Sequence, residues 1–269
     1  MPRIGDVRPN LPADISIRGL TKRYGGPGGV LAMAEVDLEI PAGDFVCVVG
    51  ASGCGKSTLL RILAGFEEAT AGYFTVDGAR VTGPGPERSV VFQDYGLFPW
   101  LSVRENIGYG PRQARLRRDL IRARVDKYLA VVGLERFADR YPSELSGGMQ
   151  QRVAIARVLA NNPAVLLMDE PFGALDALTR STLQAELARI QRDTGKTVVF
   201  VTHSIEEAVF LANRVVVMSG GASHGVAGHI AEVVDITLGA DRSVTSPEFN
   251  ELKRRISALV HQDLAAAVD

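Results

Sequence analysis

The sequence predicts an α/β fold with a largely parallel central sheet. The runs FVCVV, VLLM, TVVFV and VVVM are continuously apolar, which is typical of strands that are covered on both faces. Segments with helical spacing of apolar residues occur at about 56–65, 150–161, 177–194 and 205–213. Strands that alternate with helices favour parallel pairing, because each helix carries the chain back across one face of the sheet.

Further strand-like runs extend this sheet. They lie at 15–18, 36–40, 73–76, 89–92 and 229–235. Because little helix separates the early runs, we expect them to form an added antiparallel sheet. The stretch 95–150 has no convincing strand, and we expect a mainly helical insert there.

These patterns predict a simple domain organisation. We expect a tail over 1–14, one α/β domain over 15–219 that contains the helical insert, and a short extension of the same domain over 220–269. The extension ends in SPEFNELKRRISALVHQ, where a serine cap and a proline in the first turn predict a terminal helix.

Charge and cysteine content exclude several classes of protein. The formal net charge of −1 gives no overall basic field for nucleic acid or lipid. The two cysteines, Cys47 and Cys54, do not form a disulfide framework, and a reducing cytoplasm is the expected environment. The N-terminal residues lack the apolar core of a signal peptide, and no run approaches the roughly 20 apolar residues that span a bilayer.

A phosphate-binding loop follows the FVCVV strand. The sequence GASGCGKST matches G-x-x-x-x-G-K-[ST], a pattern in which backbone N–H groups at a helix N-terminus bind phosphate oxygens. Lys56 is expected to neutralise the β- and γ-phosphates, and the Ser57 hydroxyl to bind Mg²⁺. Cys54 is expected to be a small filler, with a redox role as the alternative. The candidate contact residues are Gly50, Ala51, Ser52, Gly53, Cys54, Gly55, Lys56, Ser57 and Thr58.

An acidic pair ends another apolar strand. In VLLMDE, Asp169 and Glu170 lie where ligands bind in parallel sheets, at the carboxyl end of the strand. We expect Asp169 to hold Mg²⁺ through water and Glu170 to activate the attacking water as a general base. A strand-end cap or a surface ion pair is the alternative interpretation.

Taken together, these motifs resemble the ATP-binding subunit of an ABC transporter, over about 15–218. The resemblance also depends on TKRYGG, VVFQD, LSGGM, PFGALD and VTHS, which occur in the family's order. It implies a P-loop NTPase cassette with a RecA-like core, an antiparallel β-subdomain and a helical subdomain, with ATP and Mg²⁺ as cofactors. Alone, the tyrosine and the histidine of these motifs would be read as packing residues.

The resemblance assigns roles to further residues. It implies that Tyr24 stacks on adenine, that Gln93 senses Mg²⁺ and water while linking the helical insert to the core, and that His203 contacts the γ-phosphate. The metal ligands would then be Ser57, Gln93 and Asp169.

A second glycine pair, in LSGGM, is explained by a dimer. In this family two subunits pair head to tail, and the signature loop of one closes on the ATP held by the other. The resemblance therefore implies that Ser146, Gly147 and Gly148 act in trans, and that Asp176 lies at the interface. The partner is expected to be an identical copy.

Sequence detail narrows the resemblance to one subfamily. Met149 departs from the commonest signature, LSGGQ, and the LSGGM form with GPGPERSVVFQDYGLFPW and DEPFGALDALTR is similar to importers of nitrate, sulfonates and taurine. The implied partners are transmembrane permease subunits and, indirectly, an extracytoplasmic substrate-binding protein, at the cytoplasmic face of the inner membrane. Phe98, Pro99 and Trp100 are candidates for the permease contact, and packing inside the helical insert is the alternative.

Two other functions stay open. The chain is either an importer ATPase, a soluble ABC ATPase that remodels protein or nucleic-acid complexes, or a regulatory protein that barely hydrolyses ATP. The arginine-rich stretch 111–124 favours no nucleic-acid role, because Leu116, Leu120, Ile121 and Val125 have near-helical spacing and predict one amphipathic helix with its arginines in water. We therefore expect no nucleic-acid partner.

Overall fold

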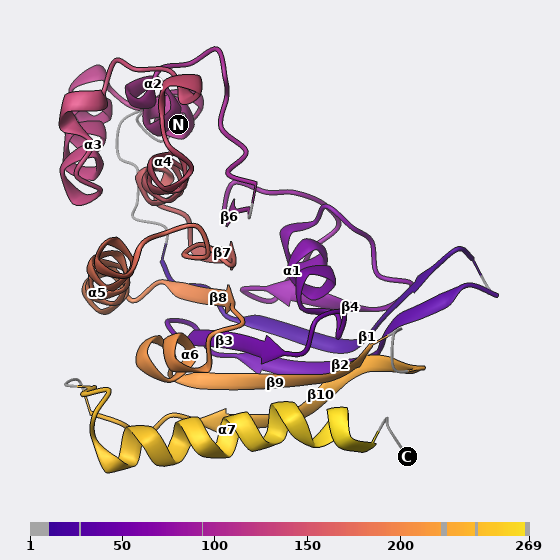
Figure 1. Ribbon diagram of the computed structural model, residues 1–269. Coiled ribbons are helices and arrows are strands. Elements are labelled where there is room, and N and C mark those ends of the chain that lie inside the picture. The colour runs from indigo at the N-terminus through magenta and orange to yellow at the C-terminus, as the bar shows by residue number, and fades with distance from the viewer. Residues whose placement is uncertain (1–10, 27, 93, 222–224, 240–241, 267–269) are drawn as a thin grey trace.

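The chain forms a single ten-stranded sheet that helices cover on both faces (Figure 1). The computed structural model describes residues 11–26, 28–92, 94–221, 225–239 and 242–266. The strand order is β5-β4-β1-β2-β10-β9-β3-β8-β7-β6. The predicted α/β class is confirmed, and the antiparallel strands continue the core sheet instead of forming a separate one.

Five neighbouring strands form the parallel core. In spatial order they are β6 (Arg88–Val91), β7 (Val165–Asp169), β8 (Thr197–Val201), β3 (Phe45–Gly50) and β9 (Arg214–Gly221). Each pairs in parallel with the next. The parallel pairing predicted from the apolar runs is therefore confirmed.

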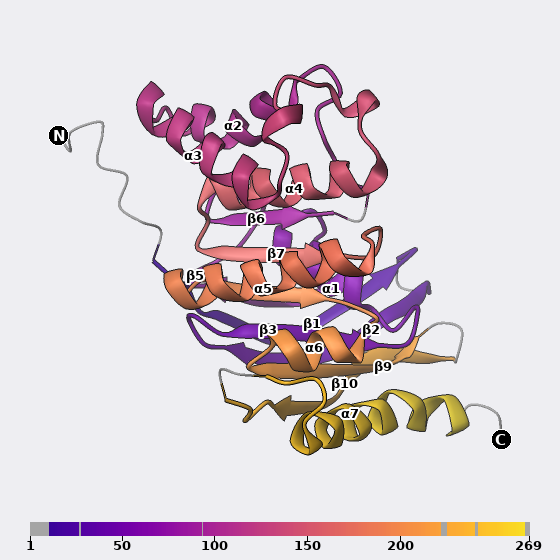
Figure 2. The ribbon, with the colours of Figure 1, turned by 60° about the vertical axis from the view of Figure 1, so that its left-hand side comes forward.

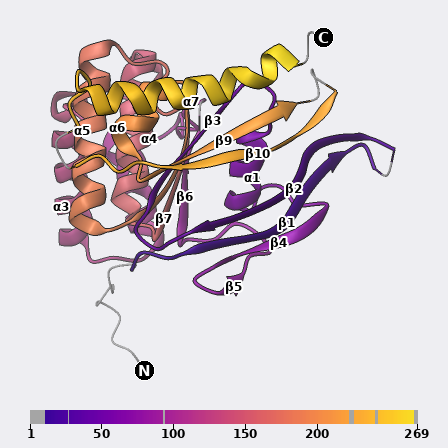
Figure 3. The same cartoon turned by 90° about the horizontal axis from the view of Figure 1, so that it is seen from below.

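The antiparallel part follows β9. It comprises β1 (Ile15–Tyr24), β2 (Val30–Ile40), β4 (Ala71–Val76), the short β5 (Ala79–Arg80) that the sequence did not predict, and β10 (Val226–Asp235). β10 pairs antiparallel with β9 and meets β2 at one parallel pair, Gly228 with Met33. Seen from below, β1 and β2 extend away from the helices as a long arm (Figure 3).

Two apolar cores lie on opposite faces of the sheet. Along β3, Phe45, Cys47 and Val49 belong to one core and Val46 and Val48 to the other, because successive side chains of a strand point to opposite faces. One core holds α1 (Lys56–Ala64) between the parallel strands and the antiparallel arm. The other holds α4 (Gly147–Asn161), α5 (Ala177–Thr194), α6 (Ile205–Leu211) and α7 (Pro247–Ala266), which lie in front of the sheet in Figure 2.

The segment between β6 and α4 is helical, as predicted, and forms α2 (Val103–Gln113) and α3 (Arg118–Val131). The amphipathic helix predicted from the stretch 111–124 is α3, on which Arg118 and Arg122 are exposed and Val125 is buried, but it begins after Leu116. Arg115 has a left-handed φ of 54°, Arg115 N–H donates to Arg112 O and Leu116 N–H donates to Pro111 O. These two bonds form a Schellman motif, which reverses the chain after α2 without a glycine.

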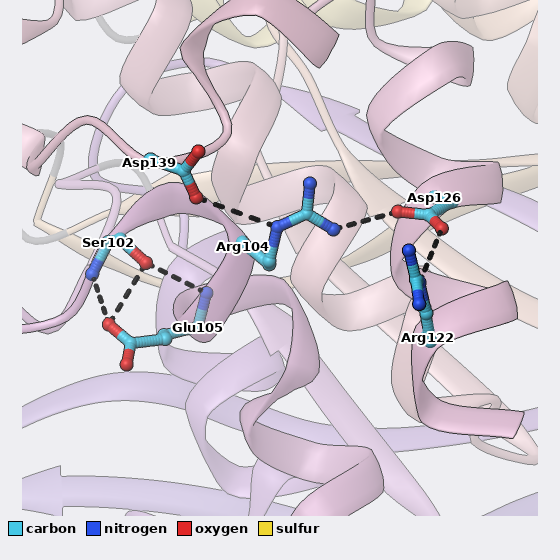
Figure 4. Close-up of polar contacts among 6 residues, drawn as sticks. All are labelled: Ser102, Arg104, Glu105, Arg122, Asp126 and Asp139. Atoms are coloured by element: carbon cyan, nitrogen blue, oxygen red, sulfur yellow. Dashed lines mark hydrogen bonds and ion pairs between the residues drawn. The ribbon is translucent and has the colours of Figure 1, made fainter. Parts of the chain in front are cut away.

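Polar contacts fix the start of α2 (Figure 4). Glu105 N–H donates to Ser102 Oγ at 3.3 Å, and Ser102 N–H donates to the Glu105 carboxylate at 2.9 Å, which is a capping box. Arg104 lies between Asp126 on α3, at 2.8 Å, and Asp139, at 3.7 Å. Because these ions are exposed, they contribute little, and the cap is the stronger constraint.

We predict that Ser102→Ala lowers the free energy of unfolding by about 1 kcal/mol, because the first turn of α2 loses its side-chain acceptor. Urea denaturation of the purified chain measures the change. The matched control is Ser181→Ala, since the Ser181 hydroxyl is exposed and bonds back to Leu178 O. Equal stability of the two variants would show that the capping box does not hold α2.

Candidate functional site

Three neighbouring parallel strands bring the predicted site residues to one edge of the sheet. β8 lies between β3 and β7, with Val201 paired both to Val48 and to Asp169. The phosphate loop after β3, the acidic pair at the end of β7 and His203 after β8 therefore meet, although they lie far apart in the sequence. Ligands bind at such carboxyl edges of parallel sheets.

Glycines shape the phosphate loop. A Cβ on Gly50 would lie 2.1 Å from Met218 O, and Gly55 has a φ of 102°. The close approach at Gly50 and the positive φ of Gly55 both favour glycine. Lys56 is 5% exposed, and its ammonium donates to Gly50 O and Ala51 O, each at 2.8 Å. The lysine thus lies folded along the loop, with its charge at the loop's centre.

The N-terminus of α1 has no cap from a side chain. A side-chain oxygen caps each of α2, α4, α5 and α6, whereas α1 and α3 have no side-chain cap, and of these two only α1 also lacks an acidic residue in its first turn. Its first N–H groups and the positive end of its dipole are therefore suited to bind an external anion. Ser57 is exposed at this helix start and Thr58 is half-buried.

Oxygen ligands for a divalent cation lie beside the loop. Ser57 Oγ is 3.3 Å from the Asp169 carboxylate. Burial raises the pKa of Asp169, and the Ser57 hydrogen bond lowers it, while the nearby Glu170 raises it further. A hydroxyl and a carboxylate are hard ligands that fit Mg²⁺. Gln93, the third predicted ligand, lies outside the described residues.

Glu170 and His203 are in direct contact. His203 Nε2 lies 2.7 Å from the Glu170 carboxylate. Glu170 has a left-handed φ of 48°, and its N–H donates to Val201 O at 3.0 Å. Such a conformation is costly for a residue with a side chain and is typical of functional sites. The arrangement suits a general base whose orientation depends on the histidine.

Tyr24 lies at the end of β1, close to α1. Its hydroxyl donates to Glu67 at 2.5 Å, and the Lys22 ammonium lies 4.9 Å from its ring centroid. Burial raises the pKa of Tyr24, and the Glu67 hydrogen bond raises it further. With 43% of the residue exposed, the ring is accessible for stacking.

The signature residues gather around the starts of α4 and α5. Ser146 caps α4 by accepting the Met149 N–H at 3.3 Å, and Asp176 caps α5 by accepting the Thr179 N–H at 2.9 Å. A Cβ on Gly148 would lie 3.6 Å from Ala174 O, so the two loops are neighbours. Ser146 and Gly147 are exposed, and within the described part of the chain no hydrogen bond joins them to the phosphate loop.

An aromatic group lies on the helical segment. Phe98 contacts Tyr109, with ring centroids 4.5 Å apart, and Trp100, at 5.7 Å, while Arg157 lies over its ring. Trp100 is 70% exposed. The alternative of internal packing is therefore wrong for Trp100 and for the exposed Pro99, and Phe98 is half-buried.

Sequence reasoning missed the residue that holds this aromatic loop. Asn106 is fully buried, and its amide donates to Phe98 O, Leu101 O and Ser102 O at 2.9–3.1 Å. Its carbonyl accepts the Phe98 N–H at 2.9 Å. The only signal was an asparagine at a position where the helical pattern demands an apolar residue.

Two glycines behind the phosphate loop were also missed. A Cβ on Gly228 would lie 2.0 Å from Cys54 O, and one on Gly221 would lie 2.9 Å from Gly53 O. The β9–β10 pair therefore supports the back of the loop. Cys54 itself is buried, and burial raises its pKa, which supports the filler interpretation over the redox one.

Comparison with known proteins agrees with this geometry. The family model described as "ABC transporter" matches residues 33–173. The taurine import ATP-binding protein of Jannaschia sp. is 45% identical over 91% of this chain and 93% of its own length. The bicarbonate transport ATP-binding protein of Synechococcus elongatus is 44% identical over 92% of this chain, which matches 38% of that longer protein.

A solved structure gives the same answer for the fold. A dimeric ATP-binding cassette in a post-hydrolysis state, bound to ADP and phosphate, superposes with a TM-score of 0.74 at 33% identity, covering 84% of this chain and all of that one. Across the residues that the structure describes, no helix is long and apolar enough to cross a membrane. The chain belongs to the ABC transporter family and is an ATP-hydrolysing cassette subunit of the nitrate, sulfonate and taurine importer subfamily.

Proposed function

We propose that this chain energises an importer of a small anionic or zwitterionic compound of the taurine, sulfonate or nitrate type. The observation that carries the proposal is the edge where β3, β8 and β7 bring the uncapped start of α1, the Ser57–Asp169 pair and the Glu170–His203 contact together. The importer names of the relatives support it over a soluble remodelling ATPase.

The proposed roles follow from the contacts. The start of α1 binds the phosphates, and Lys56 leaves the carbonyls of Gly50 and Ala51 to neutralise them. Mg²⁺, held by Ser57 and Asp169 with Gln93 as a further ligand, would supply charge neutralisation at the β- and γ-phosphates. Glu170 takes the proton of the attacking water, and His203 moves from Glu170 to the γ-phosphate.

A second, identical subunit completes the site in this proposal. The exposed Ser146 and Gly147, with Gly148, bind the γ-phosphate of the partner's ATP, and Asp176 lies at the same interface. The N–H groups at the start of α4 supply the contact. ATP then favours the closed dimer and hydrolysis opens it, which is a ligand-driven shift of populations.

The remaining partners belong to the membrane. We propose that Trp100 and Phe98 contact a transmembrane permease, which places the chain peripherally at the cytoplasmic face of the inner membrane. An exposed tryptophan on a loop fixed by a buried asparagine is a suitable anchor, because little entropy is lost when it binds. An extracytoplasmic binding protein selects the cargo and acts on this chain only through the permease.

We predict that Glu170→Gln still binds ATP but hydrolyses it at least about 10²-fold more slowly, because the water loses its base. Phosphate release measures the rate, and gel filtration with ATP should show a stable dimer. Glu251→Gln, which alters an exposed ion pair on α7, is the control. Near-normal turnover of the Glu170→Gln variant would remove Glu170 from this role.

We predict that Asp169→Asn raises the unfolding temperature of the nucleotide-free chain at pH 7. Burial raises the pKa of Asp169, so folding disfavours its ionised form, and this penalty is complete above the folded-state pKa. The gain should shrink as the pH falls through that pKa. The variant should also lose the extra stability that Mg²⁺ gives with an ATP analogue.

The control for this measurement is Asp139→Asn, since the Asp139 side chain is 93% exposed and lies 3.7 Å from Arg104. It should change stability by less than about 0.5 kcal/mol. If Asp169→Asn instead makes the chain less stable than its parent at pH 7, the assigned burial penalty is contradicted.

We predict that a tagged chain, extracted gently from native membranes, retains a polytopic permease, and that Trp100→Ala binds it at least about 30-fold more weakly. ATPase activity of the isolated variant should persist. Tyr73→Ala, at an accessible aromatic on β4, is the control.

Stimulation of the ATPase activity of the extracted complex by taurine, other sulfonates, nitrate or bicarbonate then identifies the cargo. A soluble partner or nucleic acid without a permease would overturn the proposal.

A further inference from the structure

Two loops of the site are fixed at the starts of neighbouring helices. Asp176 caps α5 immediately after the loop 172–175, and Ser204 caps α6 immediately after His203. The first loop faces the signature residues, and the second contacts Glu170. A contact between the first turns of α5 and α6 would therefore connect the two loops.

Glu207, on the first turn of α6, fixes both residues that flank His203. Its side chain is 11% exposed and accepts the Thr202 hydroxyl at 2.7 Å. The Thr202 oxygen in turn accepts the Ser204 N–H at 3.0 Å, and Glu207 N–H donates to Ser204 Oγ at 3.2 Å. His203 lies between these two anchored residues, so its direction depends on them.

The same carboxylate reaches α5. Gln184 donates its amide to Glu207 at 3.1 Å, and Arg180 Nε lies 3.9 Å from Glu207 Oε1. Arg180 also donates to Leu175 O at 2.9 Å, inside the loop before Asp176. A chain of neighbouring groups therefore runs from Leu175 O through Arg180 and Glu207 to Thr202, beside His203.

One link of this path is incomplete. Arg180 Nε is buried and, among the residues that the structure describes, has no hydrogen-bond partner, and 3.9 Å is too long for a hydrogen bond. A buried donor without an acceptor is costly, so a small approach of α5 to α6 would be favourable. A movement of the Leu175 carbonyl, to which the same guanidinium is bonded, is the direct way to produce it.

We propose that Arg180 and Glu207 are positioning residues that couple the loop 172–176 to the orientation of His203. When a partner subunit presses on that loop, Arg180 closes on Glu207, and the carboxylate holds Thr202 and Ser204 so that His203 turns away from Glu170. Two residues that touch neither nucleotide nor metal thereby make hydrolysis depend on dimer closure. The inference rests on the proposed role of His203.

The test measures kcat and KM for ATP in purified single and double variants. Glu207→Gln and Arg180→Gln should each lower kcat about tenfold and change KM less than about twofold, because ATP binding does not involve them. The double variant should be no slower than either single one, since both act through one contact. Arg189→Gln, on the exposed face of α5, should match the parent protein.

Conservative variants separate positioning from folding. Thr202→Val removes the hydroxyl that Glu207 holds and should reproduce the loss, whereas Thr202→Ser keeps the hydroxyl and should restore kcat to within about twofold. Thr202 is 4% exposed, and Thr202→Val keeps its shape but leaves the Ser204 N–H without its acceptor, so kcat is measured at a temperature at which the unfolding curves show both variants to be folded. Equal kcat for Thr202→Val and Thr202→Ser would overturn the inference.

The variant His203→Ala separates a failure of the proposed coupling from a failure of the proposed role of His203. If it is slow while Glu207→Gln and Thr202→Val turn over normally, the coupling is overturned and the role of His203 stands. If His203→Ala itself turns over normally, both fail. Losses that multiply in the Arg180 and Glu207 double variant would show two independent effects and would also overturn the coupling.

Discussion

The N-terminus of α1 is the constraint around which this molecule is arranged. A buried strand leads into a loop whose backbone is held open by glycines, and the helix that follows has N–H groups that no side chain caps. In α2, α4, α5 and α6 a serine or an aspartate caps the helix start. The missing side-chain cap of α1 costs about 1 kcal/mol of stability. An anionic ligand that binds the free N–H groups would restore it.

Support for this loop comes from the paired strands β9 and β10. Met218 O and Cys54 O lie so close to Gly50 and Gly228 that a methyl group would not fit at either glycine. Lys56 fills the centre of the loop and bonds its carbonyls. These contacts fix the loop in the nucleotide-free chain, so in the proposed function phosphate binding costs little ordering, and the main change is the release of the Lys56 side chain.

How much of this the sequence predicts depends on the range of the interaction. The loop and the acidic pair follow strands directly, so motif and apolar run together located them. The strand order that makes Asp169 and Val201 neighbours is a tertiary fact, and the direct Glu170–His203 contact was not predicted. Arg115 reverses the chain without a glycine, and for that reason the predicted amphipathic helix begins at Arg118 and does not include Leu116.

The signature loop is the part that each chain contributes to its partner's site in the proposed dimer. Ser146 uses its hydroxyl to cap α4, yet the loop stays exposed and adjoins Ala174, in the loop that leads into α5. In a two-fold dimer, the signature loop of each subunit faces a complementary surface of the other subunit. Any partner surface that binds the signature loop therefore also presses on the loop before α5. Leu175 O is hydrogen-bonded to Arg180, whose Nε lies 3.9 Å from Glu207, and through the coupling proposed above that pressure reaches the residues around His203 in the same subunit. In the proposed dimer, closure of the interface at one site thereby changes the surroundings of His203 at the other.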